Sequence, residues 1–142
     1  MNYIKEYIDK INSKEIIVGK KVKKIYEKLL KESDDKSLPF YFDEEKGNRP
    51  IEFIETFCKQ AEGEIGKPIR LELFQKAYIQ ALFGFVYRDT GLRRFNETMF
   101  LVGRKNGKTT LLSAIALYMM IADGEGSAEC YSVATNKDQA SK

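Results

Sequence analysis

The chain has 142 residues, about the length of one ordinary domain, and its 43% hydrophobic and 32% charged residues suit a globular protein and argue against disorder. It contains no histidine and two widely separated cysteines, Cys58 and Cys130, which excludes Cys/His zinc sites and histidine-based catalysis and leaves two free thiols. A net charge of +3 is too small to indicate a nucleic-acid partner by itself. Because no apolar stretch could span a membrane and no secretory leader is recognisable, we expect a cytoplasmic protein without a membrane partner.

Apolar residues spaced three and four apart predict two helices at the start of the chain. The first is expected over 2–12. The second is expected from an N-cap at Ser13 to residue 31, with one broad apolar stripe made of Ile17, Val18, Val22, Ile25, Leu29 and Leu30. The lysines of this helix could contact phosphate, but a solvated helix face is the more common use of such a run.

A connector is expected over 32–50, where acidic residues gather with two prolines and a glycine, and its aromatic patch 40–42 should anchor it to a core. Pro50 suits the first turn of a third helix that reaches about residue 61. Further glycines and a proline then break the chain before a fourth helix over 71–86, which ends at a turn. We therefore expect a helical N-terminal region over 1–95.

In the last third of the chain the sequence pattern changes from successive helices to a strand, a loop, a helix and a second strand. The short apolar run 97–102 predicts a strand, a glycine-bearing basic loop follows, and an apolar helix is expected over 108–121. After a glycine-rich turn, residues 128–134 predict a second strand, and Asn136 could cap a helix that the chain ends too soon to complete. The predicted class is therefore α/β: a partial P-loop NTPase (strand, phosphate loop, helix, strand) that begins in 96–142 after the helical region.

The residues GRKNGKTT place Gly-Lys-Thr between that strand and that helix, which is the setting of a phosphate loop. Such a loop binds an anion through backbone N–H groups and the positive end of the helix dipole. Lys108 would reach the β/γ-phosphates, Thr109 would place its hydroxyl on Mg²⁺, and Thr110 could donate on the α-phosphate side. The strict pattern G-x-x-x-x-G-K-[ST] fails at Val102, so the flanking strand and helix carry the prediction. The predicted nucleotide-binding residues of the loop are Gly103, Arg104, Asn106, Gly107, Lys108, Thr109 and Thr110.

The stretch LVGRKNGKTTLLSAIALYMMIADGEG, the upstream LELFQKAYIQALFGFVYRDTGLRRF and the downstream YSVATNKDQA resemble the ATPase portion of tailed-phage terminase large subunits. The resemblance runs from about Ile16 to the end, and the family's loop also often lacks the first glycine and carries Arg-Lys-Asn before Gly-Lys-Thr. These proteins are motors that use ATP to push viral DNA into a capsid through the portal, and they cut it with a separate nuclease domain. The resemblance implies ATP and Mg²⁺ as ligands, and double-stranded viral DNA, the portal protein and the small terminase subunit as partners.

The resemblance also implies roles for individual residues. Arg104 matches a family arginine near the γ-phosphate, where a guanidinium would neutralise transition-state charge, although a solvated arginine is the alternative. With Lys108 it is a predicted catalytic residue. Gln75, in the pair Phe74-Gln75 of the fourth helix, would bond adenine N6 and N7 and select ATP, or else is an ordinary polar helix residue. Gln139 matches a family motif for which no physical role follows from the sequence.

The sequence contains no apolar strand that ends in the Asp-Glu pair of a Walker B motif. We therefore expect an N-terminal fragment that binds ATP but is a poor ATPase alone. The alternative is a non-catalytic interaction module from a truncated prophage gene, in which residues 1–95 dock on the portal or small subunit. A small kinase is a third reading, although kinases of that type usually open with the loop. Because the two predicted strands lack neighbours, either the helices hold the ATPase end or strand edges pair between chains.

Overall fold

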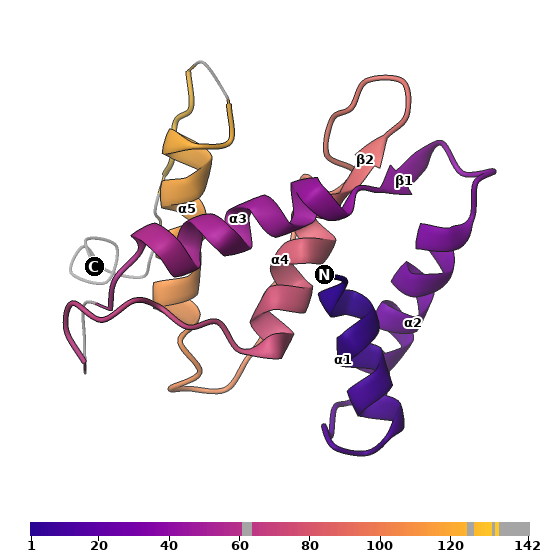
Figure 1. Cartoon of the computed structure of the whole chain (residues 1–142), viewed down its shortest axis with the longest axis horizontal. Coiled ribbons are helices and arrows are strands. Elements are labelled where there is room, and N and C mark those ends of the chain that lie inside the picture. The colour runs from indigo at the N-terminus through magenta and orange to yellow at the C-terminus, as the bar shows by residue number, and fades with distance from the viewer. Residues whose placement is uncertain (61–63, 125–126, 132, 134–142) are drawn as a thin grey trace.

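The computed structural model describes residues 1–60, 64–124, 127–131 and 133. Within them the chain forms five helices and two short strands (Figure 1). Their order is α1 (Tyr3–Asn12), α2 (Lys20–Asp34), β1 (Phe40–Phe42), α3 (Glu44–Phe57), α4 (Leu73–Gly84), β2 (Phe85–Tyr87) and α5 (Lys108–Ile121). The mixture of helices and strands agrees with the expected class, but the sheet lies elsewhere in the chain than predicted.

Helix α1 forms where its periodicity predicts it, with Asn2 as an N-cap that accepts a hydrogen bond from the Lys5 backbone at 2.9 Å. Helix α2 begins later than predicted, because Ser13 ends α1 instead of starting α2. The Ser13 hydroxyl donates to the Lys10 carbonyl at 3.1 Å, and Lys14 has a positive φ of 66° that interrupts the helical path. The N-cap of α2 is Gly19.

The apolar stripe predicted for the second helix is wrong in its first half. Only Leu29 of the six stripe residues is buried, whereas Ile17 is 93% exposed and Ile25 is 57% exposed. The part of α2 that packs is its later turns, where Leu29 joins a cluster with Ile4 of α1 and Phe40 of β1. Tyr26, which is not part of the predicted stripe, packs against Tyr7 of α1 with ring centroids 5.0 Å apart, so the buried face of α2 is offset from the predicted one.

The predicted connector contains a strand and the start of a helix. Phe40–Phe42 pairs antiparallel with Phe85–Tyr87, and the side chains of Phe40 and Phe85 are buried, so the expected anchoring of the aromatic patch is confirmed. The partner strand was predicted as the end of a helix. Gly84 ends that helix against Phe42, since an added Cβ would lie 2.6 Å from the Phe42 ring.

Helix α3 begins at Glu44 and not at Pro50, because Asp43 provides an N-cap whose carboxylate accepts from the Lys46 backbone at 3.0 Å. Pro50 lies inside the helix and is buried. Figure 1 shows α3 running across both α4 and α5. The close approach to α4 depends on Gly47, where a Cβ would lie 2.8 Å from the Gln80 side chain.

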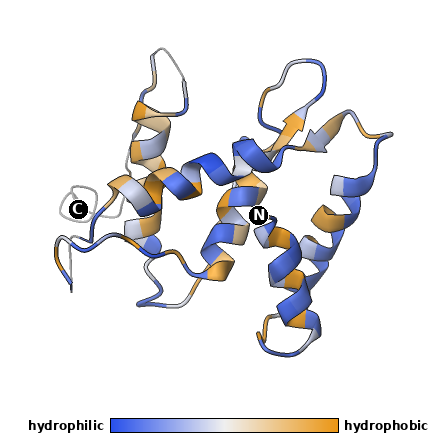
Figure 2. Cartoon of the chain, in the orientation of Figure 1, coloured by the Kyte–Doolittle hydropathy of each residue, from blue (hydrophilic) through white to orange (hydrophobic). Residues whose placement is uncertain are grey.

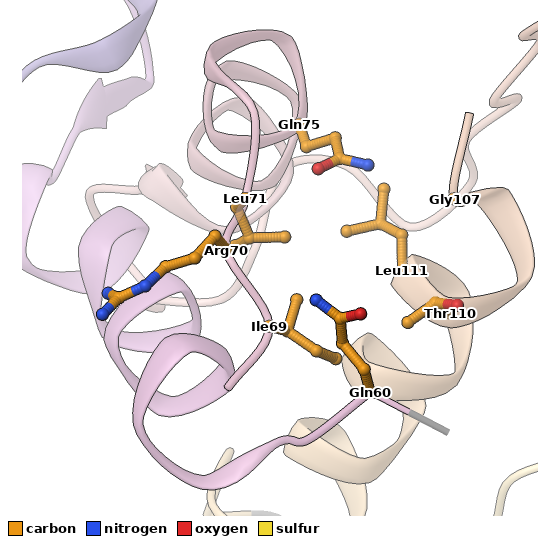
Figure 3. A pocket seen from close by; sticks show the side chains of 8 residues that line it. All are labelled: Gln60, Ile69, Arg70, Leu71, Gln75, Gly107, Thr110 and Leu111. Atoms are coloured by element: carbon orange, nitrogen blue, oxygen red, sulfur yellow. The ribbon is translucent and has the colours of Figure 1, made fainter. Parts of the chain in front are cut away.

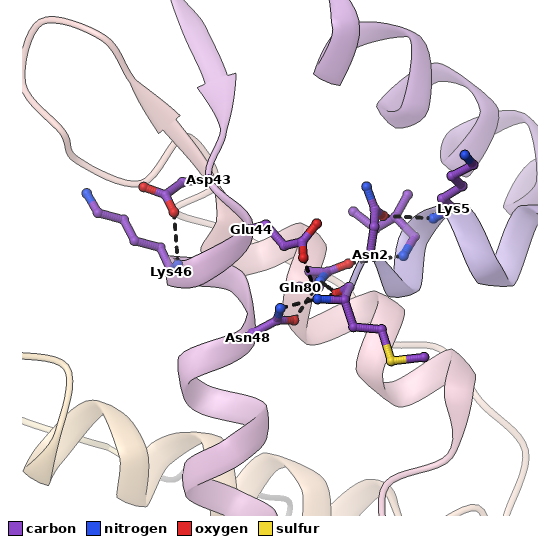
Figure 4. A network of polar contacts seen from close by, with 9 residues as sticks. Asn2, Lys5, Asp43, Glu44, Lys46, Asn48 and Gln80 are labelled. Atoms are coloured by element: carbon purple, nitrogen blue, oxygen red, sulfur yellow. Dashed lines mark hydrogen bonds and ion pairs between the residues drawn. The ribbon is translucent and has the colours of Figure 1, made fainter.

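A buried glutamine ties the start of the chain to α3 and α4 (Figure 4). The Gln80 side chain accepts from the Ile4 backbone at 3.0 Å and donates to the Met1 carbonyl at 2.8 Å and to the Asn48 side chain at 2.7 Å. The terminal ammonium of Met1 pairs with Glu44. All the hydrogen-bonding groups of this amide are therefore engaged, which is what full burial of a polar side chain requires.

The main core lies where α3, α4 and α5 meet the segment that follows α3. Its buried members are Ile51, Ile54, Cys58, Ile69, Leu71, Ile79, Phe83, Leu111, Ala114, Ile115 and Tyr118. In Figure 2 the apolar colour predominates in the later turns of α5, whereas its first turn is hydrophilic. Cys58 is buried and Cys130 exposed, both are free as expected, and burial raises the pKa of the Cys58 thiol.

Neither strand predicted for the last third is present in the described residues. Residues 97–102 have no regular secondary structure and Leu101 is 88% exposed, and 128–131 likewise form no strand. A strand needs a neighbour for its backbone groups, and the described part of the chain places none beside either segment. Residues 134–142, with the predicted cap Asn136, lie outside the described residues. Among the described helices, none is long and apolar enough to cross a lipid bilayer.

Candidate phosphate-loop site

The loop 103–107 leads directly into α5, whose bounds agree with the prediction. Gly107 is the helix N-cap and has a left-handed backbone, with φ +66°. Its carbonyl accepts from the Leu111 backbone at 2.9 Å, and no side chain caps the helix. The first-turn N–H groups therefore have no side-chain acceptor, which leaves the positive end of the helix open to an anion.

The side chain of Asn106 holds the loop in shape. Its amide nitrogen lies 3.2 Å from the carbonyl oxygen of Gly103 and 3.2 Å from that of Arg104. Lys105, between them, has a positive φ of 64°. The predicted loop residue Asn106 therefore acts on the loop's own backbone in this structure, and the turn it closes presents Arg104 and Lys105 outward.

The charged and hydroxyl side chains predicted to bind a nucleotide are all accessible. Arg104, Lys108, Thr109 and Thr110 are exposed, and none of them makes a side-chain hydrogen bond or ion pair to the described residues. Arg104 and Lys108 thus supply two cations, and the two threonines supply two hydroxyl groups, that the described part of the fold does not use.

The structure brings Gln75 to the loop, although the two are distant in sequence. Gln75 is buried at the start of α4, where its side-chain oxygen accepts from the Glu72 backbone at 2.9 Å. Glu72 in turn caps the Gln75 backbone, so the two residues form a capping box. The Gln75 amide nitrogen lies 3.4 Å from the Asn106 carbonyl oxygen. The amide therefore bridges the start of α4 and the loop.

Aromatic contacts hold the segment before the loop against α4. The Phe100 ring stacks parallel to Phe74 with centroids 6.4 Å apart and packs on Tyr78 at 4.5 Å. The Tyr78 hydroxyl lies 3.0 Å from the Thr98 hydroxyl. Phe74, one half of the predicted Phe74-Gln75 pair, therefore packs beside the chain that leads into the loop.

A cavity of about 200 Å³ lies between α4, the start of α5 and the segment that follows α3 (Figure 3). Its lining combines apolar side chains with polar ones: Gln60, Ile69, Arg70, Leu71, Gln75, Gly107, Thr110 and Leu111. The segment after α3 is folded back on itself, with the Gln60 backbone donating to Lys67 at 2.8 Å and Ile69 donating to Cys58 at 3.1 Å. Gln60 was not predicted as a site residue, because only this fold-back places it near the loop.

No group of three or more His, Cys, Asp or Glu side chains is arranged to hold a metal among the described residues. The Thr109 hydroxyl is the predicted metal ligand, and it is exposed at the first turn of α5. Gln139, the remaining residue of the family pattern, lies outside the described residues.

Comparison with known proteins matches the second half of the chain. Residues 73–142 match the family model of the terminase large subunit, ATPase domain. The terminase large subunit of Enterobacteria phage HK97 is 39% identical over 77 residues, a match that covers 54% of this chain and 14% of that protein. No solved structure matches. The resemblance read in the sequence is thereby confirmed over this region, which is similar to the ATPase domain of terminase large subunits.

Proposed function

We propose that the chain is part of the ATP-driven motor that packages viral DNA and that it binds Mg²⁺-ATP at the loop 103–110. The observation that carries this proposal is Gly107: a left-handed glycine that ends the loop, followed by Lys108 and Thr109 on the uncapped first turn of α5. These residues lie inside the region that matches the terminase ATPase domain. A helix N-terminus of this kind, with a lysine beside it, suits a polyphosphate.

Each predicted side chain has a defined part in this proposal. Lys108 binds the β- and γ-phosphates, Thr110 bonds on the α-phosphate side, and Arg104 approaches the γ-phosphate. The Thr109 hydroxyl fits Mg²⁺, which prefers oxygen ligands and keeps several waters. When bound, the ion neutralises charge on the phosphate oxygens. Because the sequence carries no Walker B pair, we propose binding rather than efficient turnover by this chain alone.

The terminase relationship also suggests the setting. We propose double-stranded viral DNA, the portal protein and the small terminase subunit as partners, in the cytoplasm of a host cell. Self-association is a further proposal. So is the division into an N-terminal region over 1–95 and the beginning of the ATPase domain over 96–142, in which α4, the helix expected over 71–86, borders the adenine side of the site.

Calorimetric titration of Mg²⁺-ATP into the chain tests the proposal directly. Wild-type protein should bind saturably, and Lys108→Ala should lose measurable binding. Lys105→Asn is the matched control: it removes a charge from the same loop, and asparagine tolerates the left-handed backbone of that position. It should bind nearly as the wild type does.

Two results would contradict the proposal. Equal loss in both variants would mean that the loop attracts anions only through its general charge. Absence of binding in the wild-type protein would favour the alternative of a non-catalytic interaction module in which residues 1–95 dock on a portal or small subunit.

A further inference from the structure

The solvent side of α2 carries a row of exposed lysines. Figure 1 shows α2 at the edge of the molecule, beside α1. At 3.6 residues per turn, five of its lysines fall within an arc of about 100° and extend along roughly 16 Å of the helix. The members of this lysine row are Lys20, Lys21, Lys24, Lys28 and Lys31. The row faces away from the side of α2 that is packed, where Leu29 is buried and Tyr26 contacts α1.

The charge of the lysine row is largely uncompensated. Within the described part of the chain, only Lys28 of the five pairs with an acidic group, at 3.6 Å from Glu32, and its side chain is 71% exposed. Exposed pairs of this kind contribute little. Glu32 is moreover held by Arg94 at 2.7 Å. The row therefore presents nearly its full positive charge to solvent.

The first turn of α2 shows that these lysines do not serve the helix itself. Lys20 and Lys21 lie in that turn, which has no acidic residue, and the N-cap Gly19 makes no side-chain hydrogen bond. The start of a helix carries partial positive charge and is stabilised by acidic side chains, so cations there are unfavourable. Departures from a local rule without a gain in stability are expected where a residue serves function. A bound polyanion would relieve this repulsion.

The surroundings of the row favour a duplex over other polyanions. Proteins that bind single strands combine basic residues with aromatic side chains on which bases stack, but the tyrosine of α2, Tyr26, packs edge-on against Tyr7 at 5.0 Å. A helix that binds a lipid surface needs a free apolar face. Tyr26 and Leu29 of α2 are used inside the protein, which leaves Val22 and Ile25 exposed. A duplex needs neither feature, because it presents closely spaced phosphates along its whole length.

We propose that the lysine row of α2 binds the phosphate backbone of double-stranded DNA. This inference deepens the proposed function, in which such DNA is a partner, and gives it a contact surface separate from the phosphate loop. Contacts to phosphate carry no sequence information. The row would therefore hold a duplex at any point along its length, as the packaging of viral DNA requires.

The salt dependence of DNA binding tests the inference. The anisotropy of a short fluorescent duplex is titrated with the chain at several salt concentrations, without nucleotide. The slope of log K against log salt should be about −4.5 in the wild-type protein, since each neutralised phosphate contributes about −0.9. Lys24→Gln with Lys28→Gln should make the slope shallower by about 2. Lys24→Arg with Lys28→Arg keeps the charges and should keep the slope.

A matched control removes two lysines at the far end of the molecule. Lys59→Gln with Lys67→Gln changes the net charge by the same amount in the segment after α3, which Figure 1 shows at the opposite end from α2. This variant should keep the wild-type slope, and duplexes of different sequence should bind equally. An equal change of slope in both pairs of glutamine variants would show that only net charge matters and would overturn the assignment to α2.

A second pair of substitutions separates binding from folding. Lys20→Gln with Lys21→Gln should weaken duplex binding and raise the temperature of unfolding, because it removes cations from the positive end of α2. A lower temperature of unfolding would show that these lysines support the helix and would contradict the inference. Tighter binding of a single strand of equal length, or of phosphatidylserine vesicles, would overturn the choice of a duplex.

The same variants distinguish this inference from the proposed nucleotide site. The Lys24 and Lys28 glutamine variant should bind Mg²⁺-ATP as the wild type does, and Lys108→Ala should keep the wild-type slope with DNA. Duplex binding that is lost in Lys108→Ala and kept in the α2 variant would place DNA on the phosphate loop and overturn the inference. Duplex binding through α2 without any binding of Mg²⁺-ATP would support the inference and contradict the proposed nucleotide binding.

Discussion

Gly107 is the residue on which the geometry of the loop depends most. Its φ of +66° lies in the left-handed region, and a Cβ there would sit 3.3 Å from the Gln75 amide nitrogen. A non-glycine residue in this region costs roughly 1–2 kcal/mol. The added methyl group would also press on the amide that links the loop to α4.

We predict that Gly107→Ala lowers both stability and ATP affinity. Urea unfolding should show a loss of about 1–2 kcal/mol. Titration should show ATP affinity falling as well, because the contact with Gln75 shifts. Gly124→Ala is the matched control, since it has φ +89° but open space around the added Cβ. It should lose similar stability and keep ATP affinity. Equal loss of affinity in both variants would show that strain alone is responsible.

Among the elements, α2 is joined to the chain after β2 by one well-formed ion pair. Arg94 donates to Glu32 through two nitrogens, at 2.7 and 3.4 Å, and both side chains are largely buried. The guanidinium also lies over the Phe40 ring, 3.7 Å from its centroid. Charge-assisted, bidentate pairs of this kind are the stronger ones. This contact compensates for the limited packing of α2 elsewhere.

This pair makes stability depend on pH in a defined direction. The hydrogen bond from Arg94 is the main cause that holds the pKa of Glu32 below its ordinary value of 4.5. A lowered pKa in the folded state means that its contribution is fully present above about pH 4.5 and is lost as the pH falls through the folded value. Thermal unfolding from pH 7 to pH 3 should therefore show an acid-dependent loss that is smaller in Glu32→Gln.

The control for this prediction lies on the same helix. Glu27 pairs with Lys23 at 3.8 Å on the exposed face of α2, where ion pairs contribute little. Glu27→Gln should therefore unfold with the wild-type pH dependence. An acid profile altered as much by Glu27→Gln as by Glu32→Gln would contradict the role given to Arg94.

At the scale of the whole molecule, what the sequence could predict was local. The periodicity of α1, the apolar run of α5 and the aromatic anchor at Phe40 are properties of short segments, and the predictions for them are confirmed. The pairing of β1 with β2 joins residues far apart in sequence, so no local pattern reveals it. The predicted strands of the last third fail for the related reason that a strand depends on a partner.

In the candidate site, too, features of short segments could be predicted from the sequence, whereas contacts between distant segments could not. The Gly-Lys-Thr motif marks the start of α5, and the fold brings the amide of Gln75 to within 3.4 Å of the Asn106 carbonyl oxygen, while its role toward a base stays a prediction. The engagement of its amide by Glu72 could not be foreseen, because a capping box is recognised only when the helix boundary is known. Gln60 was missed altogether, since the fold-back that positions it consists of backbone hydrogen bonds between residues without periodicity.

Helix α5 exposes more apolar surface than a surface helix of a globular protein usually does. Leu111, Ala114, Ile115 and Tyr118 face the core, yet Met120 is 54% exposed and Ile121 is 68% exposed. A helix that is apolar all round is typical of a buried position. The exposed face of α5 therefore favours association with a further apolar surface.

We predict that the chain self-associates through this face. Sedimentation velocity over a wide concentration range should show a monomer converting to larger species, because burying the face removes apolar surface from water. Met120→Lys with Ile121→Lys should shift this equilibrium toward the monomer without lowering the temperature of unfolding, since neither side chain is in the core. Ile17→Lys, at a 93% exposed position in the turn before α2, is the control and should leave association unchanged. A wild-type chain that remains monomeric at every concentration would contradict the prediction, whereas equal effects of both sets of substitutions would place the contact elsewhere.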